Sequence, residues 1–228
     1  MPEETYPQRR FTPPPGAVEV VLVRHGASEA AVPGEPFESL EGRANPALSD
    51  IGRQQAVQVA ERLRHEEISA LFCTTLERTK QTAAPLAEHT RLTPTEIPEL
   101  AEVSLGDWEG GELRIRAANR DPLFFEVMAA ERWDAIPGAE PADDFAARVK
   151  RGLQAVLERA EPDSKVVVVA HGGVIGELCR QAADSRPFAF IHSDNCSITR
   201  LVCFPGADFV LLRSFNDTAH LDGFVAVK

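Results

Sequence analysis

Two almost wholly apolar runs stand out along the chain, VEVVLV at 18–23 and KVVVVA at 165–170. Both are short and rich in β-branched valine, which is typical of strands buried on both faces of a parallel sheet. Less regular apolar segments, bounded by turn residues, predict further strands. These lie at 69–74, within 95–103, at 196–204 and at 208–214.

Between the strands, apolar residues recur with the spacing of helices that bury one face. The clearest helix is predicted at 143–160, with Asp143 or Asp144 as its cap. Its apolar stripe consists of Phe145, Val149, Leu153, Val156 and Leu157. Other helices are predicted at 52–64 after a cap by Ser49 or Asp50, at 76–88 with a bend or shifted start because of Pro85, within 112–134 with a break at Asp121-Pro122, and at 174–183.

Strands that alternate with helices predict βαβ units and an α/β fold. The expected architecture is a three-layer αβα sandwich with a mainly parallel central sheet, forming a single domain over 18–228. The prolines at 13–15 predict that residues 1–17 form an extended, flexible tail. Ligands of such sheets bind beyond the carboxyl ends of the strands, so the residues that follow each strand are candidates for a site.

The charge balance narrows the classes of partner. With 24 Lys and Arg against 35 Asp and Glu, the net charge of −11 argues against nucleic acid or an anionic membrane. It leaves open a small anionic ligand in a local basic pocket. No apolar stretch reaches the ~20 residues of a membrane-spanning helix. The polar start MPEETYPQRR has no signal-peptide character, which predicts a cytoplasmic protein.

The cysteines indicate neither a zinc site nor a disulfide framework. Cys73, Cys179, Cys196 and Cys203 form no C-x-x-C pair and match no zinc motif. They are expected to be buried thiols in a reducing compartment.

Both valine-rich strands run directly into a histidine and a glycine. The first is followed by RHG at 24–26 and the second by HGG at 171–173. Two histidines at equivalent strand ends predict a shared site. The glycines are expected to allow tight turns and a close approach of a ligand to the backbone.

Two arginines indicate an anionic ligand at this edge of the sheet. Arg24 follows an apolar run, where an unpaired guanidinium is costly to bury. Arg78 lies in the first turn of a predicted helix, and both helix N-termini and guanidinium groups favour phosphate oxygens. The predicted ligand is therefore a phosphate-sized oxyanion.

A resemblance to a known family is carried by motifs that occur in this order: VLVRHGASE, NPALSDIGRQQA, TTLERTKQTA, LAEVSLGDWEG and VVVVAHGGVIGEL. Their order and spacing resemble the histidine phosphatase superfamily, which has the phosphoglycerate-mutase-like fold. The resemblance covers roughly residues 18–217, nearly the whole of the predicted domain.

The resemblance implies roles for five residues. His25 matches the histidine that takes up the phosphoryl group, and Glu102 matches the carboxylate that donates a proton to the leaving oxygen. Arg24, Arg78 and His171 match the cationic pocket around the phosphate, with His171 as an imidazolium. One nitrogen of His25 must face phosphorus unprotonated, so the other is expected to donate to a backbone carbonyl. Such chemistry needs positioning and charge compensation, and implies no metal or other cofactor.

The chain departs from the family pattern after the first glycine. Family members often carry Glu or Gln next, and an Asn five residues after the glycine that touches the phosphate; these places hold Ala27 and Ala31. A missing amide weakens phosphate binding by about 1 kcal/mol if nothing replaces it. The expected substitutes, and hence candidate substrate-binding residues, are Ser28 and Arg43 in the loop predicted at 26–45.

The segment 104–140, which follows the proposed acid, is expected to form a small helical cap over the pocket. It is rich in aromatic residues, and Phe124, Phe125, Trp108 or Trp133 is expected to shape specificity. Mutases of the family have a longer, basic insertion here, whereas this segment is compact and mixes arginines with acids. It therefore favours a substrate with an apolar or sugar-like part over one with a second phosphate.

Three functions stay open on this fold. A phosphatase, in which water attacks a phosphohistidine, is favoured over a phosphoglycerate mutase and over a non-catalytic protein that binds a phosphorylated ligand. The expected partner is a small phosphorylated substrate, with no nucleic acid and no membrane, and the sequence is compatible with a homodimer. A metal site of His25, His171, Glu29 and Glu102 is disfavoured, because neighbouring arginines would repel a cation.

Overall fold

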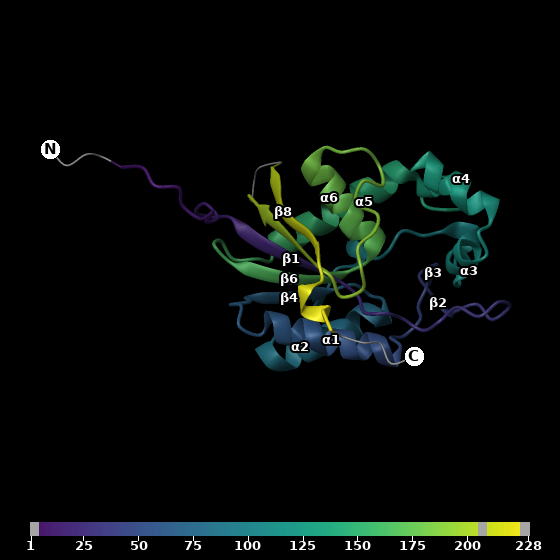
Figure 1. The fold of residues 1–228 in the computed structure, drawn as a ribbon, viewed down its shortest axis with the longest axis horizontal. Helices are drawn as coiled ribbons and strands as arrows, with labels where there is room; N and C mark the ends of the chain where they lie inside the picture. Colours follow the sequence, from purple (N-terminus) through teal and green to yellow (C-terminus); the bar gives the residue numbers. More distant parts are fainter. Residues whose placement is uncertain (1–4, 205–208, 224–228) are drawn as a thin grey trace.

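The computed structural model describes residues 5–204 and 209–223, and Figure 1 shows helices on both sides of a central sheet. Within these residues the sheet has six strands in the order β5-β4-β6-β1-β7-β8. They are β1 (Val18–Arg24), β4 (Ala70–Cys73), β5 (Thr95–Glu96), β6 (Lys165–Ala170), β7 (Ile198–Cys203) and β8 (Val210–Asp217). β5, β4, β6 and β1 are parallel, and β7 is antiparallel to both neighbours. The predicted α/β class with a mainly parallel sheet is confirmed.

Four longer helices form the outer layers (Figure 1). They are α1 (Asp50–Leu63) and α2 (Glu77–Thr90) on one face, and α5 (Ala142–Leu157) and α6 (Gly172–Ala183) on the other. The predicted cap of α1 is confirmed, because the Ser49 side chain accepts a hydrogen bond from the Gly52 amide. The stripe predicted for α5 is also buried, except that Leu157 is partly exposed.

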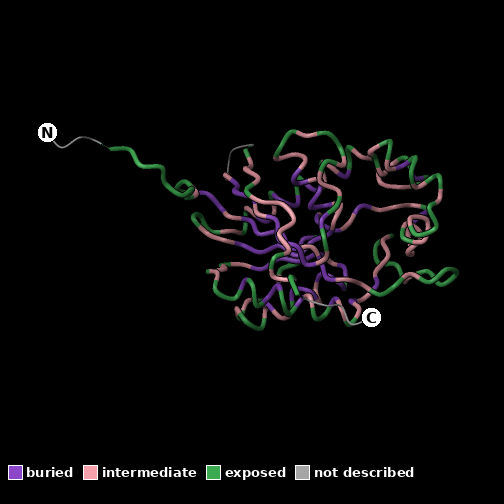
Figure 2. Tube along the Cα trace, viewed as in Figure 1, coloured by how far each residue is buried: buried purple, intermediate pink, exposed green. Residues whose placement is uncertain are grey.

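The central strands are buried on both faces, as their valine-rich sequences predict. Val20 and Leu22 of β1 belong to the apolar cluster shared with α5 and α6. Val21 and Val23, which alternate with them, belong to the cluster shared with α1 and α2. Figure 2 shows these buried residues concentrated along the middle of the sheet. The rigid centre of the protein therefore lies directly beneath the residues that follow β1 and β6.

Short elements occupy the segment between α2 and α5. They are η1 (Pro98–Leu100), η2 (Gly106–Trp108), α3 (Glu112–Ala118), α4 (Pro122–Ala130) and η3 (Trp133–Ala135). The predicted helix break is confirmed: the Asp121 side chain caps α4 by accepting a hydrogen bond of 2.9 Å from the Leu123 amide. Trp108, Val127 and Ile136 form the centre of a small separate apolar cluster. This cluster packs the segment on itself beside the main domain layers (Figure 1).

Two predictions about helix ends are wrong. α5 begins at Ala142 with Pro141 as its N-cap, so Asp143 and Asp144 lie in the first turn instead of capping it. There they still favour the helix through its dipole. Pro85 does not set the start of α2, because it lies inside that helix. The lost hydrogen bond is offset by packing of neighbouring apolar residues against the sheet.

The loop predicted at 26–45 contains a small hairpin. It consists of β2 (Ser39–Leu40) and β3 (Arg43–Ala44). Glu41 and Gly42 join the strands with φ angles of 52° and 77°, the left-handed values required by a tight two-residue turn. Strands of two residues are too short to show alternation, which is why the pattern did not predict them.

The chain ends are only partly described. Residues 1–4 of the predicted tail lie outside the described residues, and so does residue 208, the first of the strand predicted at 208–214. In Figure 1 the described part of the tail extends away from the sheet. It is attached at Gly16, whose amide donates a 2.6 Å hydrogen bond to Asp163. No helix of the described residues is long and apolar enough to cross a membrane.

All four cysteines are buried and free, as predicted. Burial raises the pKa of the Cys73 thiol to about 11. It raises the pKa values of Cys179, Cys196 and Cys203 to about 12. These thiols are therefore protonated at neutral pH and unreactive.

Candidate active site

The carboxyl ends of adjacent parallel strands bring two histidines together. His25 follows β1 and His171 follows β6, and the His25 amide donates a hydrogen bond of 3.0 Å to the carbonyl of Ala170, the last residue of β6. The two imidazole rings lie edge to face with centroids 5.2 Å apart. The predicted convergence of the RHG and HGG segments is therefore confirmed.

His25 is held as one neutral tautomer. Its Nδ1 lies 2.8 Å from the Gly26 carbonyl, to which it donates, and its Nε2 accepts a 3.2 Å hydrogen bond from Nε of Arg78. Only an imidazole with its proton on Nδ1 satisfies both contacts. Burial, together with the charges of Arg78 and Arg24, holds the pKa of His25 well below its usual range. The Nε2 lone pair is thus available as a nucleophile at neutral pH.

The glycines at the strand ends serve packing within the protein. A Cβ on Gly26 would lie 2.5 Å from the carbonyl oxygen of Gly52, so this glycine allows α1 to approach the loop after β1. A Cβ on Gly173 would lie 2.5 Å from Oε1 of Glu102, so this glycine leaves room for the Glu102 carboxylate. The expectation that a ligand approaches the backbone at Gly26 is wrong, because backbone already occupies that space.

His171 lies behind His25 and is fully buried. Its Nε2 is 2.9 Å from the Thr74 hydroxyl, and its Nδ1 has no hydrogen-bond partner among the described residues. Burial, followed by the charges of Arg78 and its neighbours, holds the pKa of His171 well below its usual range. The lowered pKa disfavours the expected imidazolium, and His171 is not among the residues that line the cavity in front of His25.

A cavity of about 160 Å³ opens at His25. Four arginines line it, namely Arg24, Arg43, Arg78 and Arg114. Its other walls include the carboxylates of Glu102 and Glu109 and the apolar side chains of Phe37, Leu105, Trp108 and Leu113. The volume is below the roughly 300–1,000 Å³ of ordinary small-molecule pockets. It suits an oxyanion such as phosphate, compensated by the surrounding guanidinium groups.

Backbone carbonyls tether the two arginines that flank His25. Arg78 donates a 2.9 Å hydrogen bond from Nη1 to the Ala44 carbonyl, and Arg24 donates from Nη1 to the Ser193 carbonyl. Burial lowers the pKa of Arg78 to about 10, so its guanidinium stays positive at neutral pH. Neither arginine lies in a salt bridge within the described residues, which leaves their charge available for an anion.

The fold and this geometry agree with the comparisons with known proteins. Residues 20–218 match the model of the histidine phosphatase superfamily, branch 1. The chain belongs to the histidine phosphatase superfamily.

Named relatives within this superfamily include mutase-like proteins and phosphatases. "Phosphoglycerate mutase-like protein 4" of Arabidopsis thaliana is 33% identical over 209 residues, which cover 90% of this chain and 87% of that one. The solved mycobacterial glucosyl-3-phosphoglycerate phosphatase is 31% identical with a TM-score of 0.69, covering 89% of this chain and 100% of that one. A putative α-ribazole-5′-P phosphatase of Escherichia coli is 26% identical with a TM-score of 0.69, covering 88% and 96%.

In this histidine phosphatase superfamily member, Glu102 lies on the cavity wall with His25. Its Oε2 accepts a 3.1 Å hydrogen bond from the Gly173 amide, and its Oε1 accepts one of 3.0 Å from the Val103 amide. The nearby Glu109 also lines the cavity, and its carboxylate accepts hydrogen bonds of 2.7 and 2.8 Å from the amides of Ala44 and Leu105. Amide contacts therefore do not separate the two carboxylates. Glu102 is the candidate acid because its charge acts on both arginines that flank His25, whereas that of Glu109 acts on Arg78 only.

Of the substitutes expected for the missing amide, only Arg43 reaches the cavity. Its Nε donates to the backbone carbonyl of Glu102. Ser28 does not line the cavity, and its hydroxyl accepts a 2.7 Å hydrogen bond from Nη2 of Arg114. Ser28 therefore supports Arg114, which itself faces the cavity.

The aromatic residues of the 104–140 segment are divided among different surroundings. Phe125 does not line the cavity, and 53% of its surface is exposed. It lies two positions before Val127, the buried residue of α4, and hence on the opposite side of that helix. Phe124 packs in the small cluster of the segment, and Trp108 alone of the four aromatic candidates lines the cavity.

Sequence reasoning missed Thr74 and Arg114. Thr74 directly follows β4, so the rule that singled out the two histidines could have found it. Arg114 had no such signal, since it is one of several arginines in its segment. The structure separates it from the others: Arg116 and Arg132 pair with carboxylates, whereas Arg114 donates to the Ser28 hydroxyl and to the Glu29 carbonyl.

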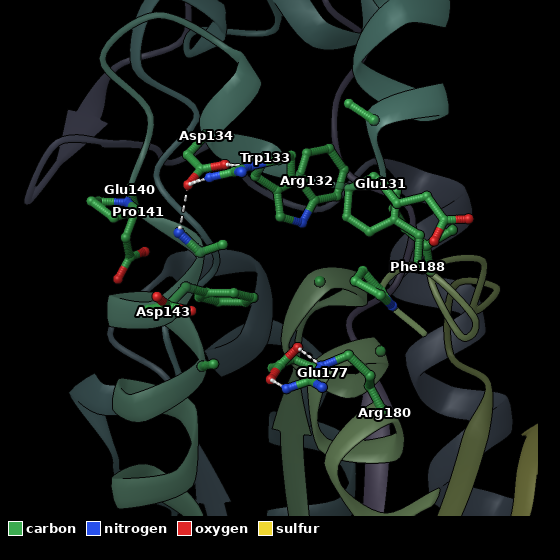
Figure 3. A pocket seen from close by; sticks show the side chains of 18 residues that line it. Glu131, Arg132, Trp133, Asp134, Glu140, Pro141, Asp143, Glu177, Arg180 and Phe188 are labelled. Carbon is green, nitrogen blue, oxygen red and sulfur yellow. Dashed lines mark hydrogen bonds and ion pairs between the residues drawn. The ribbon is translucent and has the colours of Figure 1, made fainter. Parts of the chain in front are cut away.

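A larger groove of about 600 Å³ lies between the 130–146 segment and α6. Figure 3 shows Glu140 and Asp143 near the start of α5, Trp133 and Asp134 at the end of the preceding segment, and Glu177 and Arg180 on α6. Gly173 also lies on its wall. The groove therefore reaches Gly173, whose amide donates to the Glu102 carboxylate.

The described residues contain no group of three or more His, Cys, Asp or Glu side chains placed to hold a metal ion. The polar lining of the cavity at His25 is mainly guanidinium, which binds anions and not cations.

Proposed function

We propose that this protein is a cytoplasmic phosphatase that hydrolyses a small phosphorylated metabolite through a phosphohistidine on His25. It is a phosphoric monoester hydrolase that needs no metal ion. The observation that carries the proposal is an imidazole with an unprotonated Nε2, which accepts a hydrogen bond from Arg78, at a small cavity lined by four arginines. The histidine that would accept the phosphoryl group and the arginines that would bind its oxygens therefore lie at the same cavity.

The first step transfers the phosphoryl group to His25. Its Nε2 lone pair attacks phosphorus, and the bond between phosphorus and the ester oxygen breaks. Glu102 in its protonated form donates its proton to that oxygen, so the alcohol leaves neutral. The hydrogen bond from Nδ1 to Gly26 keeps the ring oriented and supports the positive charge that the ring acquires.

The second step releases inorganic phosphate. Water attacks phosphorus while the Glu102 carboxylate takes one of its protons, and the bond between phosphorus and nitrogen breaks. Its electron pair returns to Nε2, so His25 and Glu102 both regain their starting states. Arg24 and Arg78 balance the charge of the phosphoryl oxygens throughout.

The proposed acid makes the effect of Glu102→Gln depend on the leaving group. We expect kcat/KM for an alkyl phosphate to fall by about 10²–10⁴, the usual contribution of one general acid. The loss on p-nitrophenyl phosphate is expected to be much smaller, because p-nitrophenolate leaves without a proton. Glu99→Gln is the matched control, because it removes a carboxylate that does not line the cavity. Equal losses on both esters would show that Glu102 does not act as the acid.

The class of substrate is a small ester with a sugar-like or apolar part. The cavity combines arginines with apolar side chains such as Trp108 and Leu113, which suits a polar carbon skeleton better than a second phosphate. Two relatives named above have phosphatase names, for glucosyl-3-phosphoglycerate and α-ribazole-5′-P, and these names support hydrolysis of a phosphorylated sugar derivative here.

The deciding experiment is a panel of phosphate esters that includes sugar phosphates and 3-phosphoglycerate, followed by ³¹P NMR. We expect inorganic phosphate to appear without any added primer. Isomerisation of 3-phosphoglycerate that depends on a bisphosphorylated primer would identify a mutase instead, the function in the name of the Arabidopsis relative. Saturable binding without turnover of any ester would identify a non-catalytic binding protein.

A further inference from the structure

The segment that carries Glu102 is held by hydrogen bonds from several directions. Glu102 itself lines the cavity at His25. Glu140, which accepts from the Ser104 amide, and Gly173, whose amide donates to the Glu102 carboxylate, line the 600 Å³ groove of Figure 3.

Arg148 of α5 donates three hydrogen bonds to the backbone that ends at Glu102. Its Nη1 donates to the carbonyls of Glu99 and Ala101 at 2.7 and 2.8 Å, and its Nη2 donates to the carbonyl of Glu102 at 3.3 Å. One guanidinium thus binds three backbone carbonyls within four consecutive residues. Its side chain is only 14% exposed, so these contacts are sheltered from water.

Glu140 holds Arg148 in this orientation. Its two carboxylate oxygens accept hydrogen bonds of 2.7 Å each from Nε and Nη2 of Arg148, a bidentate pair. The Glu140 carboxylate also accepts from the Ser104 amide at 3.3 Å and lies 3.5 Å from Nη2 of Arg43. Burial raises the pKa of Glu140, but Arg148 and the other donors outweigh it and lower the pKa overall. The pair is therefore charged at neutral pH.

The network reaches the cavity at His25 through Arg43. This arginine lines that cavity and donates to the same Glu102 carbonyl that Arg148 binds. The Glu102 backbone is thus fixed from two directions, while the Gly173 amide fixes its carboxylate. We propose that Arg148, oriented by Glu140, is a positioning residue that sets the place of Glu102 for proton transfer to the leaving oxygen.

This inference rests on the proposed function, in which Glu102 is the general acid. Proton transfer depends steeply on geometry, and a displacement of about 1 Å can cost about 10²-fold in rate. Arg148 does not line the cavity at His25, and the backbone carbonyl that it binds there belongs to Glu102. Its effect must therefore depend on whether the leaving group needs a proton.

The test compares kcat/KM for an alkyl phosphate and for p-nitrophenyl phosphate in the full-length protein. The value of kcat/KM reports the steps up to loss of the alcohol and not the later release of phosphate. We expect Arg148→Met and Glu140→Gln to lower the value for the alkyl ester by about 10–100-fold. The value for the aryl ester should fall by less than about threefold. Arg148→Lys, which keeps the charge but loses the planar fork, should fall between wild type and Arg148→Met.

Two further variants make the outcome decisive. Arg151→Met removes an exposed arginine of the same helix and should leave both values unchanged. Adding Arg148→Met to Glu102→Gln should cause no further loss on the alkyl ester, because both changes disable one function.

Equal losses on the two esters in the Arg148 and Glu140 variants would overturn the positioning role, and so would full additivity with Glu102→Gln. If Arg148→Met does not fold, Glu140→Gln and Arg148→Lys carry the same comparison. A leaving-group effect in Glu102→Gln but in none of the network variants would refute this inference and keep the proposed function. If Glu102→Gln also shows no leaving-group effect, both this inference and the proposed role of Glu102 as the acid are refuted.

Discussion

His25→Ala is expected to abolish release of inorganic phosphate from every ester, lowering kcat/KM by about 10⁵-fold or more. That is the scale of loss when the nucleophile of a covalent mechanism is removed. Neither His171 nor a cysteine can replace it: His171 is fully buried behind His25, and all four thiols are buried. Aryl and alkyl esters should be affected alike, in contrast to the leaving-group dependence of Glu102→Gln.

The measurement has two parts, turnover of p-nitrophenyl phosphate and trapping of the phosphoenzyme. Phosphohistidine is labile in acid, so the reaction is to be quenched without acid. The phosphoenzyme should then be present in wild type and absent in His25→Ala. His89→Ala, which removes an exposed histidine of α2, is the matched control and should keep both signals. A phosphoenzyme that persists in His25→Ala would place the covalent intermediate on another residue.

Folding of His25→Ala is expected to be retained. The pKa of this imidazole, like that of His171, is held well below its usual range by burial and by the charges of Arg78 and Arg24. Keeping such a group neutral costs stability below its ordinary pKa, because the unfolded chain can bind the proton and the native state cannot. Below pH 6.5, His25→Ala should therefore lose less stability than wild type as the pH falls. Thermal unfolding of both proteins at several pH values would show this.

Strand direction explains why the centre of the site is predictable from sequence. β1 and β6 are marked by valine-rich, almost wholly apolar runs, and parallel neighbours end at the same edge of a sheet. Arg24 at the end of β1, His25 directly after it and His171 directly after β6 therefore have to lie close together. Arg78 follows from the next strand and the helix that begins after it. These predictions were possible because each site residue lies within a few positions of the end of a strand.

Residues that act across long sequence separations could not be predicted in this way. Arg148 binds carbonyls 46 to 49 positions earlier, and Arg114 binds Ser28 at a separation of 86. Nothing in local periodicity indicates which arginine on a helix turns inward. Phe125 illustrates a site prediction from composition that the structure does not support. The aromatic residues of the 104–140 segment suggested that it shapes specificity, but its place on α4 leaves it exposed.

Arg78→Met is expected to lower kcat/KM by about 10²–10³, on aryl and alkyl esters alike. The variant removes a preorganised, buried donor aimed at the oxygens of the phosphoryl group, and the loss of one such donor commonly has this effect. Nε of Arg78 already lies 3.2 Å from Nε2 of His25, the atom that attacks phosphorus. Arg91→Met, an exposed arginine directly after α2, is the matched control and should leave kcat/KM unchanged.

The same variant is expected to shift the pH dependence of kcat/KM. After burial, the charge of Arg78 is the largest cause of the lowered pKa of His25, because it disfavours a second positive charge on the imidazole. Its removal raises that pKa, so His25 becomes protonated and inactive at a higher pH than in wild type. The acid limb of the profile should therefore move toward higher pH, while burial keeps it below the ordinary histidine value. Using p-nitrophenyl phosphate for both proteins cancels the ionisation of the substrate itself. An acid limb that stays in place or moves toward lower pH would show that Arg78 does not control the protonation of His25, even if the variant loses activity.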